Sequence, residues 1–368
     1  MTQSRLHQLS ALGQSVWIDT LSREMLRSGK LARLMEDDAV VGVTSNPTIF
    51  QKALAAGDAY DDQLKEELGE ERDPKELFIR LAGKDVGDAC DLLRGVWDGG
   101  DGLRGNVSIE VDPTLAYDTE ATIDEAARLH ELIDRPNLYV KIPATEAGLP
   151  AIEEMIARGK SINVTLIFSL ERYVEVAEAY IRGLERLVEA GDDPAPIASV
   201  ASFFVSRVDT EADRRLDELG GHDDLKGKLA IANAKLAYQR FEEIFAGERW
   251  EPLAAAGATP QWCLWASTST KNPEYRDVMY VEELIGPRTV NTMPLETVAA
   301  FQEHGEVALT LEQGIDEAER VFERLAGAGV DYDDVTATLE REGVEKFSDS
   351  FAELSDGIRA KSGELVPA

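Results

Sequence analysis

Short hydrophobic runs of strand length recur along the chain, and amphipathic stretches separate them. The runs are apolar or alternate between apolar and polar residues, which is typical of buried strands. Between them, segments such as 122–133, 170–190 and 225–245 carry apolar residues three and four positions apart, which predicts helices. Eight runs fit the strand pattern: Ser15–Asp19, Val40–Asn46, Asn106–Asp112, Leu138–Ala144, Ile162–Phe168, Pro196–Phe204, Trp262–Ser267 and Thr289–Pro294.

This alternation predicts parallel strands joined by crossover helices, and eight such units close into a barrel. We therefore expect an α/β fold, a (β/α)8 TIM barrel with additional helices, in a single domain over 1–368. Helical insertions are expected near 51–105 and 209–260, with a helical C-terminal extension over 295–368, because these stretches exceed what one crossover helix requires. A doubly wound sheet is the alternative, but no Gly-rich dinucleotide fingerprint follows the first strand.

Within the extension, the apolar spacing predicts helices over 294–311, 315–328 and 333–355. No stretch rich in proline, glycine or serine interrupts the chain, and no repeat of fixed period is present. One domain with helical additions is therefore the simplest organisation.

Polar residues on the predicted strands share one face. In 138–142, Leu138, Val140 and Ile142 form an apolar face, and Lys141 lies opposite. Alternate strand residues point into a barrel, and barrel active sites form at the carboxyl ends of the strands. The same alternation places further polar residues away from their aliphatic neighbours: Asp19, Thr44, Asn46, Glu110, Asn163 and Thr165.

Lys141 is the central candidate, because a lysine within an apolar strand is costly to bury unless it is paired or functional. It could snorkel to solvent, or form a buried ion pair with Glu110 or Asp19. The functional interpretation is a nucleophilic amine that forms a Schiff base. Desolvation favours the neutral amine that this chemistry needs, whereas nearby carboxylates oppose it.

Schiff-base chemistry also needs groups that move protons, and Glu110 and Asp19 supply two carboxylates on separate strands. Either could instead be a structural hydrogen-bond acceptor. Asn46, Asn163 and Thr165 could orient substrate hydroxyls or a catalytic water, or could form hydrogen bonds across the barrel.

The composition of the chain argues against some classes of binding partner. The chain has 38 Lys and Arg against 70 Asp and Glu, a formal net charge of −32, which argues against nucleic acid. No apolar run could span a membrane and the N-terminus lacks a secretory pattern, so we expect a cytoplasmic protein. Cys90 and Cys263 lie far apart and the four histidines are scattered, which predicts reduced thiols and argues against a zinc site and a histidine triad. We expect the Schiff-base chemistry to need neither a metal nor a cofactor. A disulfide between the cysteines is the alternative, and the pattern does not fix an oligomeric state.

Several strand segments, in this order, resemble the transaldolase family of Schiff-base aldolases over nearly the whole chain, and more closely a longer-chain bacterial-type subgroup. The similarity lies in the ordered set on successive strands, since any one segment alone is a weak signal. The segments are VWID at 16–19, GVTSNP at 42–47, VSIEVD at 107–112, YVKIPAT at 139–145, INVTLIFS at 162–169 and SFFVSR at 202–207.

The resemblance implies reversible transfer of a dihydroxyacetone unit from sedoheptulose 7-phosphate to glyceraldehyde 3-phosphate. The products would be erythrose 4-phosphate and fructose 6-phosphate, in the pentose phosphate pathway. By position, Lys141 matches the Schiff-base lysine and Asp19 the acid/base at the cleaved bond, while Glu110 and Thr165 match the pair that manages the catalytic water. The residues that match substrate-positioning residues are Asn46, Asn163 and Ser202.

Arg207 matches a phosphate-binding arginine of the family, and a guanidinium binds phosphate bidentately. The alternative is a surface salt bridge with Asp209 or Glu211. A second arginine of the family lies in an Ala-Ser-x-Arg-Asn context, whereas 266–272 reads ASTSTKN, two residues longer. Lys271 would then take that arginine's place as a point charge.

Phe204 bears on the nearest alternative activity, that of fructose-6-phosphate aldolases, which tend to carry tyrosine at this position. A phenol can assist a catalytic water and a phenyl ring cannot, so Phe204 favours transfer over free aldol cleavage. A barrel that binds sugar phosphates without catalysis is the alternative from another functional class.

Overall fold

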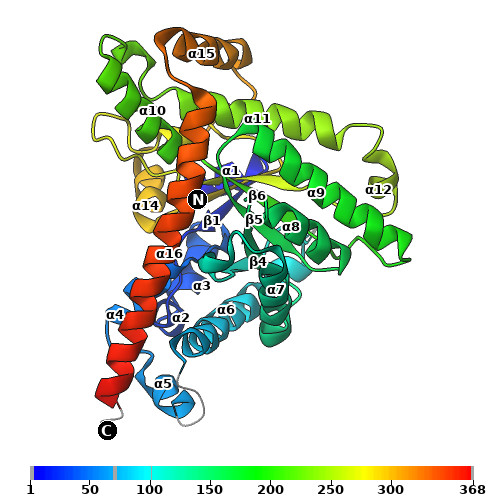
Figure 1. The fold of residues 1–368 in the computed structure, drawn as a ribbon, viewed down its shortest axis with the longest axis vertical. Coiled ribbons are helices and arrows are strands. Elements are labelled where there is room, and N and C mark those ends of the chain that lie inside the picture. Colours follow the sequence, from blue (N-terminus) through cyan, green and yellow to red (C-terminus); the bar gives the residue numbers. More distant parts are fainter. Residues whose placement is uncertain (1–3, 69–72, 101, 366–368) are drawn as a thin grey trace.

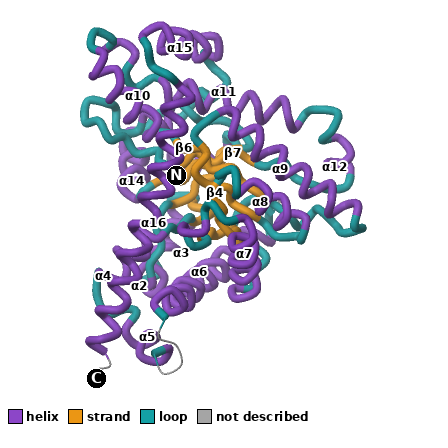
Figure 2. Tube along the Cα trace, viewed as in Figure 1, coloured by secondary structure: helices purple, strands orange, loops and turns teal. Residues whose placement is uncertain are grey.

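The computed structural model describes residues 4–68, 73–100 and 102–365, and its strands form a closed parallel barrel. Each strand pairs with the next along the chain, and β1 pairs with β8 to close the ring. The predicted (β/α)8 barrel is therefore confirmed (Figures 1 and 2). The strands are β1 (Gln14–Ile18), β2 (Val40–Val43), β3 (Asn106–Glu110), β4 (Leu138–Pro143), β5 (Ile162–Ile167), β6 (Ser199–Phe204), β7 (Trp262–Ala266) and β8 (Thr289–Met293).

Helices surround the strands, which lie at the centre of the molecule in Figure 2. Those before β5 are α1 (Arg5–Ala11), α2 (Arg23–Arg27), α3 (Lys30–Asp37), α4 (Pro47–Ala55), α5 (Asp61–Glu67), α6 (Pro74–Asp98), η1 (Pro113–Leu115), α7 (Thr119–Ile133) and α8 (Gly148–Ala157). Those after β5 are α9 (Leu170–Glu189), α10 (Ser206–Leu219), η2 (Asp223–Leu225), α11 (Leu229–Phe245), α12 (Glu251–Ala255), α13 (Met279–Glu282), α14 (Leu295–His304), α15 (Ile315–Ala328) and α16 (Tyr332–Leu365).

The intervals 51–105 and 209–260 contain several helices each, among them α5 and α6 in the first and α11 and α12 in the second. We infer that both are insertions in one domain, and that 295–368 is its C-terminal extension. No helix in the described part of the chain combines the length and the apolar character needed to cross a membrane.

Some predicted boundaries were wrong, for local reasons. The strand predicted over 196–204 begins only at Ser199, because a turn with a hydrogen bond from Ile197 N to Pro194 O precedes it. The helix predicted over 294–311 ends at His304. Gly305 follows it, where a Cβ would lie 2.4 Å from the Phe301 ring. The helix predicted over 333–355 continues to Leu365.

Large side chains fill the barrel below its polar end. Trp17 lies against Gly42, where an added Cβ would come within 2.3 Å of the indole ring. On the other side, Trp17 stacks on Tyr139 at 6.1 Å between ring centroids. This packing makes the barrel a solid core, so the open space is confined to the carboxyl ends of the strands.

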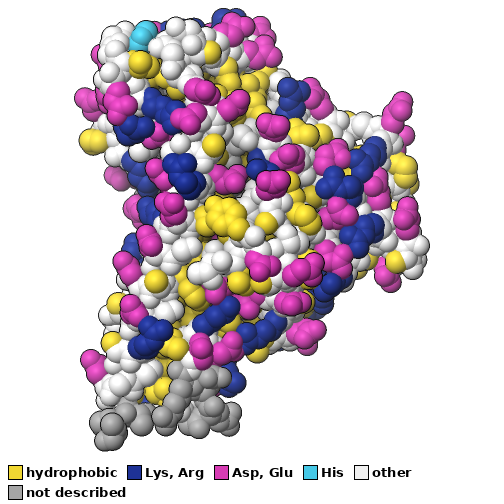
Figure 3. Space-filling view, viewed as in Figure 1, with side chains coloured by type: hydrophobic (Ala, Val, Ile, Leu, Met, Phe, Trp, Pro, Cys, Tyr) yellow, Lys and Arg dark blue, Asp and Glu magenta, His cyan; other side chains and the backbone are white. Residues whose placement is uncertain are grey.

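The long helix α16 runs along one side of the molecule, from α10 to α4 and α5 (Figure 1). Its middle passes the barrel mouth, where Thr48 Oγ1 of α4 donates to Ser350 Oγ at 2.7 Å. The chain's last described helix is therefore part of the frame around the open end of the barrel. On the face shown in Figure 3, acidic and basic side chains are interspersed, consistent with a solvated surface of mixed charge.

Candidate active site

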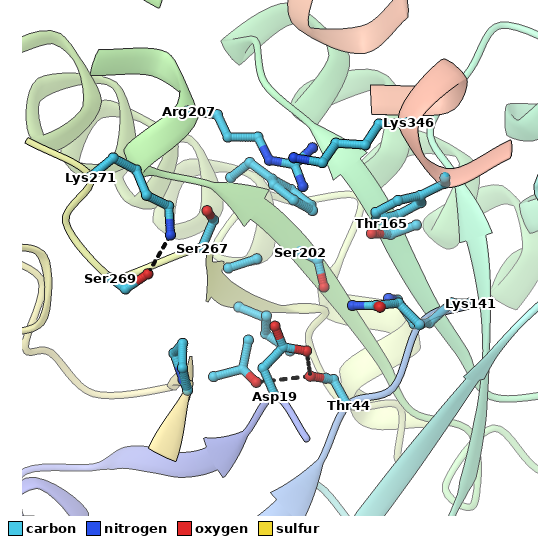
Figure 4. A pocket seen from close by; sticks show the side chains of 17 residues that line it. Asp19, Thr44, Lys141, Thr165, Ser202, Arg207, Ser267, Ser269, Lys271 and Lys346 are labelled. Atoms are coloured by element: carbon cyan, nitrogen blue, oxygen red, sulfur yellow. Dashed lines mark hydrogen bonds between the residues drawn. The ribbon is translucent and has the colours of Figure 1, made fainter. Parts of the chain in front are cut away.

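A cavity of about 210 Å³ opens at the carboxyl ends of the strands (Figure 4). Most of the predicted site residues line it, and they come from separate strands and loops. Glu110 and Asn163 are not in its wall but contact residues that are. The predicted residues in the wall are Asp19, Asn46, Lys141, Thr165, Ser202, Phe204, Arg207 and Lys271.

Lys141 lies on β4, buried at 5% exposure, with its amine at the cavity wall. Its Nζ donates to Glu110 Oε2 at 3.2 Å and to the Ser45 carbonyl oxygen at 3.2 Å. The ion pair that the sequence allowed is therefore formed, with Glu110 and not with Asp19. Because the amine also borders the cavity, the pair does not close it off from a substrate.

Two carboxyl groups act electrostatically on this amine. Burial raises the pKa of Glu110, and the charge of Lys141 opposes that rise. Asp19 follows β1 and borders the cavity, yet lies deep enough in the barrel for desolvation to raise its pKa. Lys141 and a 3.0 Å hydrogen bond from Thr44 Oγ1 oppose this rise. Carboxyl groups with raised pKa values beside a nucleophile are suited to proton transfer near neutral pH.

Thr165 and Asn163 lie on β5 and play different parts. Thr165 Oγ1 is buried and has no hydrogen-bond partner among the described residues, so the alternative of a hydrogen bond across the barrel does not hold for it. Asn163 does form such bonds, because Nδ2 donates to Ser108 Oγ at 3.0 Å and Oδ1 accepts from Ser202 Oγ at 2.7 Å. Thr165 thus offers a hydroxyl to a cavity molecule, while Asn163 holds Ser202 in place.

The backbone beside Thr165 is strained. Leu166 adopts a φ of 60°, which is unusual for a non-glycine residue, and the pairing of β5 with β6 shifts register between Val164 and Ile167. Ser267, after β7, also has a positive φ of 58° and lines the cavity. Strain of this kind tends to gather at functional sites.

Arg207 lies at the start of α10, over an aromatic floor. Its guanidinium carbon is 5.0 Å from the centre of the Phe204 ring and 5.8 Å from that of Phe347. The alternative of a surface salt bridge is wrong, because Asp209 is buried with other partners and Glu211 pairs with different arginines. Burial lowers the pKa of Arg207, and Asp19 and Glu110 oppose that shift.

Lys271 reaches the cavity from the loop after β7, and its Nζ donates to Ser269 Oγ at 2.7 Å (Figure 4). Burial lowers its pKa, and the nearby charges of Arg207 and Lys346 lower it further, against the opposing effect of Glu296. Cationic side chains therefore gather at the mouth of the cavity in a strongly acidic protein.

Comparison with known proteins agrees with this geometry. The family model described as Transaldolase/Fructose-6-phosphate aldolase matches residues 16–358. The chain belongs to this family. A transaldolase of Frankia alni is 54% identical over 97% of this chain and 97% of its own length. A transaldolase of Acidothermus cellulolyticus is 54% identical over 96% and 95%, and one of Mycolicibacterium smegmatis is 51% identical over 99% and 98%.

Membership of the transaldolase/fructose-6-phosphate aldolase family confirms the resemblance drawn from the ordered strand segments. The relatives match nearly end to end, so the similarity includes the long C-terminal helix as well as the barrel. Cys90 and Cys263 are buried, unbonded thiols, as predicted. In the part of the chain that the structure describes, His, Cys, Asp and Glu side chains form no group of three suited to a metal ion.

The site of this transaldolase-family chain also contains residues that the sequence reasoning missed. Lys346 and Phe347 reach the cavity from α16, more than 200 positions along the chain from Lys141. The strand alternation had placed Thr44 on the inner face without giving it a role. The other additions are Leu264, Ala266, Ser267, Ser269, Thr292 and Pro294. For Ser267 and Ser269 a signal existed, since both lie in the lengthened ASTSTKN segment.

Proposed function

We propose that this protein is a transaldolase of the cytoplasmic pentose phosphate pathway. It would move a dihydroxyacetone unit reversibly from sedoheptulose 7-phosphate to glyceraldehyde 3-phosphate, giving erythrose 4-phosphate and fructose 6-phosphate. The observation that carries the proposal is the buried Lys141 amine on a cavity wall, within the electrostatic reach of two carboxyl groups. Near-full-length relatives described as transaldolases support it.

In the proposed mechanism, the Lys141 amine adds to the C2 carbonyl of the ketose phosphate. The carbinolamine then loses its oxygen as water and becomes an imine. Glu110, whose carboxylate lies 3.2 Å from the Lys141 amine, moves the protons that these two steps require. Thr165, whose hydroxyl has no protein partner in the described structure, would hold the water.

Cleavage of the C3–C4 bond needs a base for the C4 hydroxyl, and we assign this role to Asp19. As the hydroxyl proton passes to Asp19, the C3–C4 electron pair moves into the imine system, leaving an aldehyde and an enamine on Lys141. The aldehyde acceptor reverses the sequence, since the enamine carbon attacks it and Asp19 returns the proton. Thr44, which donates to Asp19, would orient the carboxylate.

Different residues would bind the hydroxyls and the phosphate group of the sugar phosphate. Asn46 and Ser202 face the cavity, where they would contact substrate hydroxyls, and Asn163 would act by holding Ser202. Arg207 and Lys271 would bind the phosphate group. An acidic protein can still bind an anion at a local group of cations. The contacts between these cations and the phosphate are short, whereas salt screens the distant acidic residues.

Free aldolase activity on fructose 6-phosphate is the second candidate, since the family includes both activities. Phe204 favours transfer, because its phenyl ring packs 5.1 Å from Phe168 and offers no hydroxyl to a water molecule. The two activities are distinguished by the donor. A free aldolase accepts unphosphorylated dihydroxyacetone as donor, whereas a transaldolase needs a ketose phosphate.

The proposal is tested by trapping the imine. Incubation with fructose 6-phosphate and borohydride should attach one sugar-derived unit to Lys141, detectable by peptide mass spectrometry. Lys141→Ala should lose the adduct, while Lys84→Ala, a change on the exposed face of α6, should retain it. An adduct that persists in Lys141→Ala would overturn the assignment. Binding without any adduct would instead support a non-catalytic barrel.

A further inference from the structure

Lys346 is a cation without a carboxylate partner in a protein with 70 acidic and 38 basic residues. Within the described ranges it forms neither an ion pair nor a hydrogen bond, although α16 also carries Glu345 and Asp349 close by in sequence. Its side chain lines the substrate cavity and also an outer chamber of about 540 Å³ that adjoins it. Lys346 therefore does not pair with the acidic residues of α16 but borders both the substrate cavity and the outer chamber.

The neighbours of Lys346 at the cavity are other cations. In Figure 4 its side chain extends from α16 over the cavity toward Arg207, and Lys271 approaches from the opposite side. The three groups interact electrostatically, since both Arg207 and Lys346 lower the pKa of Lys271. Cations that repel one another at the rim of a cavity are stabilised together by a bound anion.

The backbone that carries Lys346 is held in place on both sides. Gly343, one turn earlier, packs against Leu166, where an added Cβ would lie 3.0 Å from a side-chain methyl. Ser350, one turn later, accepts from Thr48 at 2.7 Å, and Phe347 is buried at 5% exposure beside the Lys141 amine. Lys346 is therefore aimed at the cavity by a fixed helix, with a long side chain that can still adjust.

We propose that Lys346 is a positioning residue that binds the phosphate group of the sugar phosphate together with Arg207 and Lys271. This inference rests on the proposed function. Arg207 supplies a planar fork with a fixed direction, whereas Lys346 supplies a point charge on a flexible stem. The C-terminal helix thereby takes part in selecting phosphorylated substrates, and Lys346 touches none of the reacting atoms.

The test compares Lys346→Gln with Lys346→Arg, and uses Arg341→Gln as the matched control. Arg341 is an exposed cation of the same helix that lines a separate groove. With sedoheptulose 7-phosphate as donor, Lys346→Gln should raise the KM for the acceptor glyceraldehyde 3-phosphate about tenfold, because the charged hydrogen bond from Lys346 to the acceptor's phosphate group is lost. The KM for unphosphorylated glyceraldehyde should stay within about twofold, and Lys346→Arg should recover most of the affinity for the phosphate.

Inorganic phosphate provides a second readout that does not depend on turnover. It should inhibit imine trapping by half-saturating fructose 6-phosphate in the parent protein. About tenfold more phosphate should be needed in Lys346→Gln at half-saturation of that variant. An equal rise in KM for both acceptors, or the same effect in Arg341→Gln, would overturn the role of Lys346. A parent protein that forms no imine would instead overturn the proposed function, so the two failures are distinguishable.

Discussion

Two buried cation–carboxylate pairs lie in different parts of this molecule and have nearly the same burial. The side chains of Arg23 and Asp85 are 4% and 0% exposed, and those of Lys141 and Glu110 are 7% and 4% exposed. Both pairs bring opposite charges within hydrogen-bonding distance, at 2.8 Å and 3.2 Å. Burial and pairing alone therefore do not separate a structural ion pair from a candidate catalytic one.

The other groups that surround each ion pair do distinguish the Arg23–Asp85 pair from the Lys141–Glu110 pair. Asp85 also accepts from Tyr60 Oη at 2.8 Å, and Arg23 also donates to the Leu81 carbonyl at 3.2 Å and lies 4.5 Å from the centre of the Tyr60 ring. Protein groups enclose this pair on all sides, whereas the Lys141 amine borders a cavity. A buried pair next to open space retains capacity for a ligand, and a pair enclosed by protein serves the fold.

Glu110→Gln should give the largest effect. If Glu110 moves protons during imine formation, kcat should fall about 10² to 10⁴-fold, the usual range for loss of a general acid–base group. The free energy of unfolding should fall less than on disruption of the Arg23–Asp85 pair. The Lys141 amine would still donate to the Ser45 carbonyl and would still border the solvent-accessible cavity. Steady-state kinetics and thermal unfolding measure both. An unchanged kcat with a large loss of stability would show that Glu110 has a structural role, like Asp85, and does not transfer protons.

Asp85→Asn should do the opposite. Arginine stays charged, so removing its carboxylate leaves a buried cation uncompensated, at a cost of about 3–5 kcal/mol in the free energy of unfolding. Asp88→Asn, on the exposed face of the same helix, should cost less than about 1 kcal/mol, because its pair with Lys84 is solvated. Denaturant unfolding measures both changes. Specific activity per folded molecule should remain close to that of the parent.

Asp209 extends the comparison to a buried carboxyl without a cation. Burial raises its pKa to about 7, although Ala230 N and Tyr280 Oη donate to it. Since the folded pKa exceeds the ordinary value of 3.8, the native state binds this proton more tightly than the unfolded chain does. The stabilising contribution is complete below about pH 4 and is lost as the pH rises to about 7, a change of up to about 4 kcal/mol.

Asp209→Asn should remove this dependence, because an amide does not titrate. The difference in unfolding free energy between the parent and the variant should then vary between about pH 4 and 7 and be flat above that window. Denaturant unfolding at several pH values measures it. A constant difference across the window would show that Asp209 has the same pKa in both states.

Thr165→Val should give the smallest effect and tests the same principle with an uncharged group. Its hydroxyl has no hydrogen-bond partner in the described structure, so a methyl group of the same shape should leave stability within about 0.5 kcal/mol or raise it. Activity should fall about tenfold if the hydroxyl holds a water. Thr145→Val is the control, because that hydroxyl donates to the Ala116 carbonyl and accepts from Gly148 N, and its loss should cost about 1–3 kcal/mol.

The strand alternation predicted the barrel and the inward direction of Lys141, because a period of two fixes which residues share a face. It was less exact at the strand ends. Asn46 lies beyond β2, where its side chain accepts from Ile49 N and caps α4, and Pro47 occupies the first helical position. The Asn-Pro pair contained that signal, since proline favours the first turn of a helix.

Lys346 and Phe347 could not be predicted in the same way. Val344, Phe347 and Phe351 have the spacing of a helix face packed on a core, and all three are buried. The pattern says that this face is covered but not by what, because the path of α16 past the barrel mouth depends on tertiary packing. The direction of the Lys346 side chain depends on where α16 runs and not on the local sequence.

The position of α16 has a consequence for the order in which the molecule can form. The barrel closes only when β8 pairs with β1, and α16 packs on α4, so both contacts join segments that lie far apart in the sequence. Contacts between residues so far apart in sequence form slowly, since a long loop must close before they stabilise anything. During synthesis, the rim of the cavity therefore stays incomplete until α16 has left the ribosome.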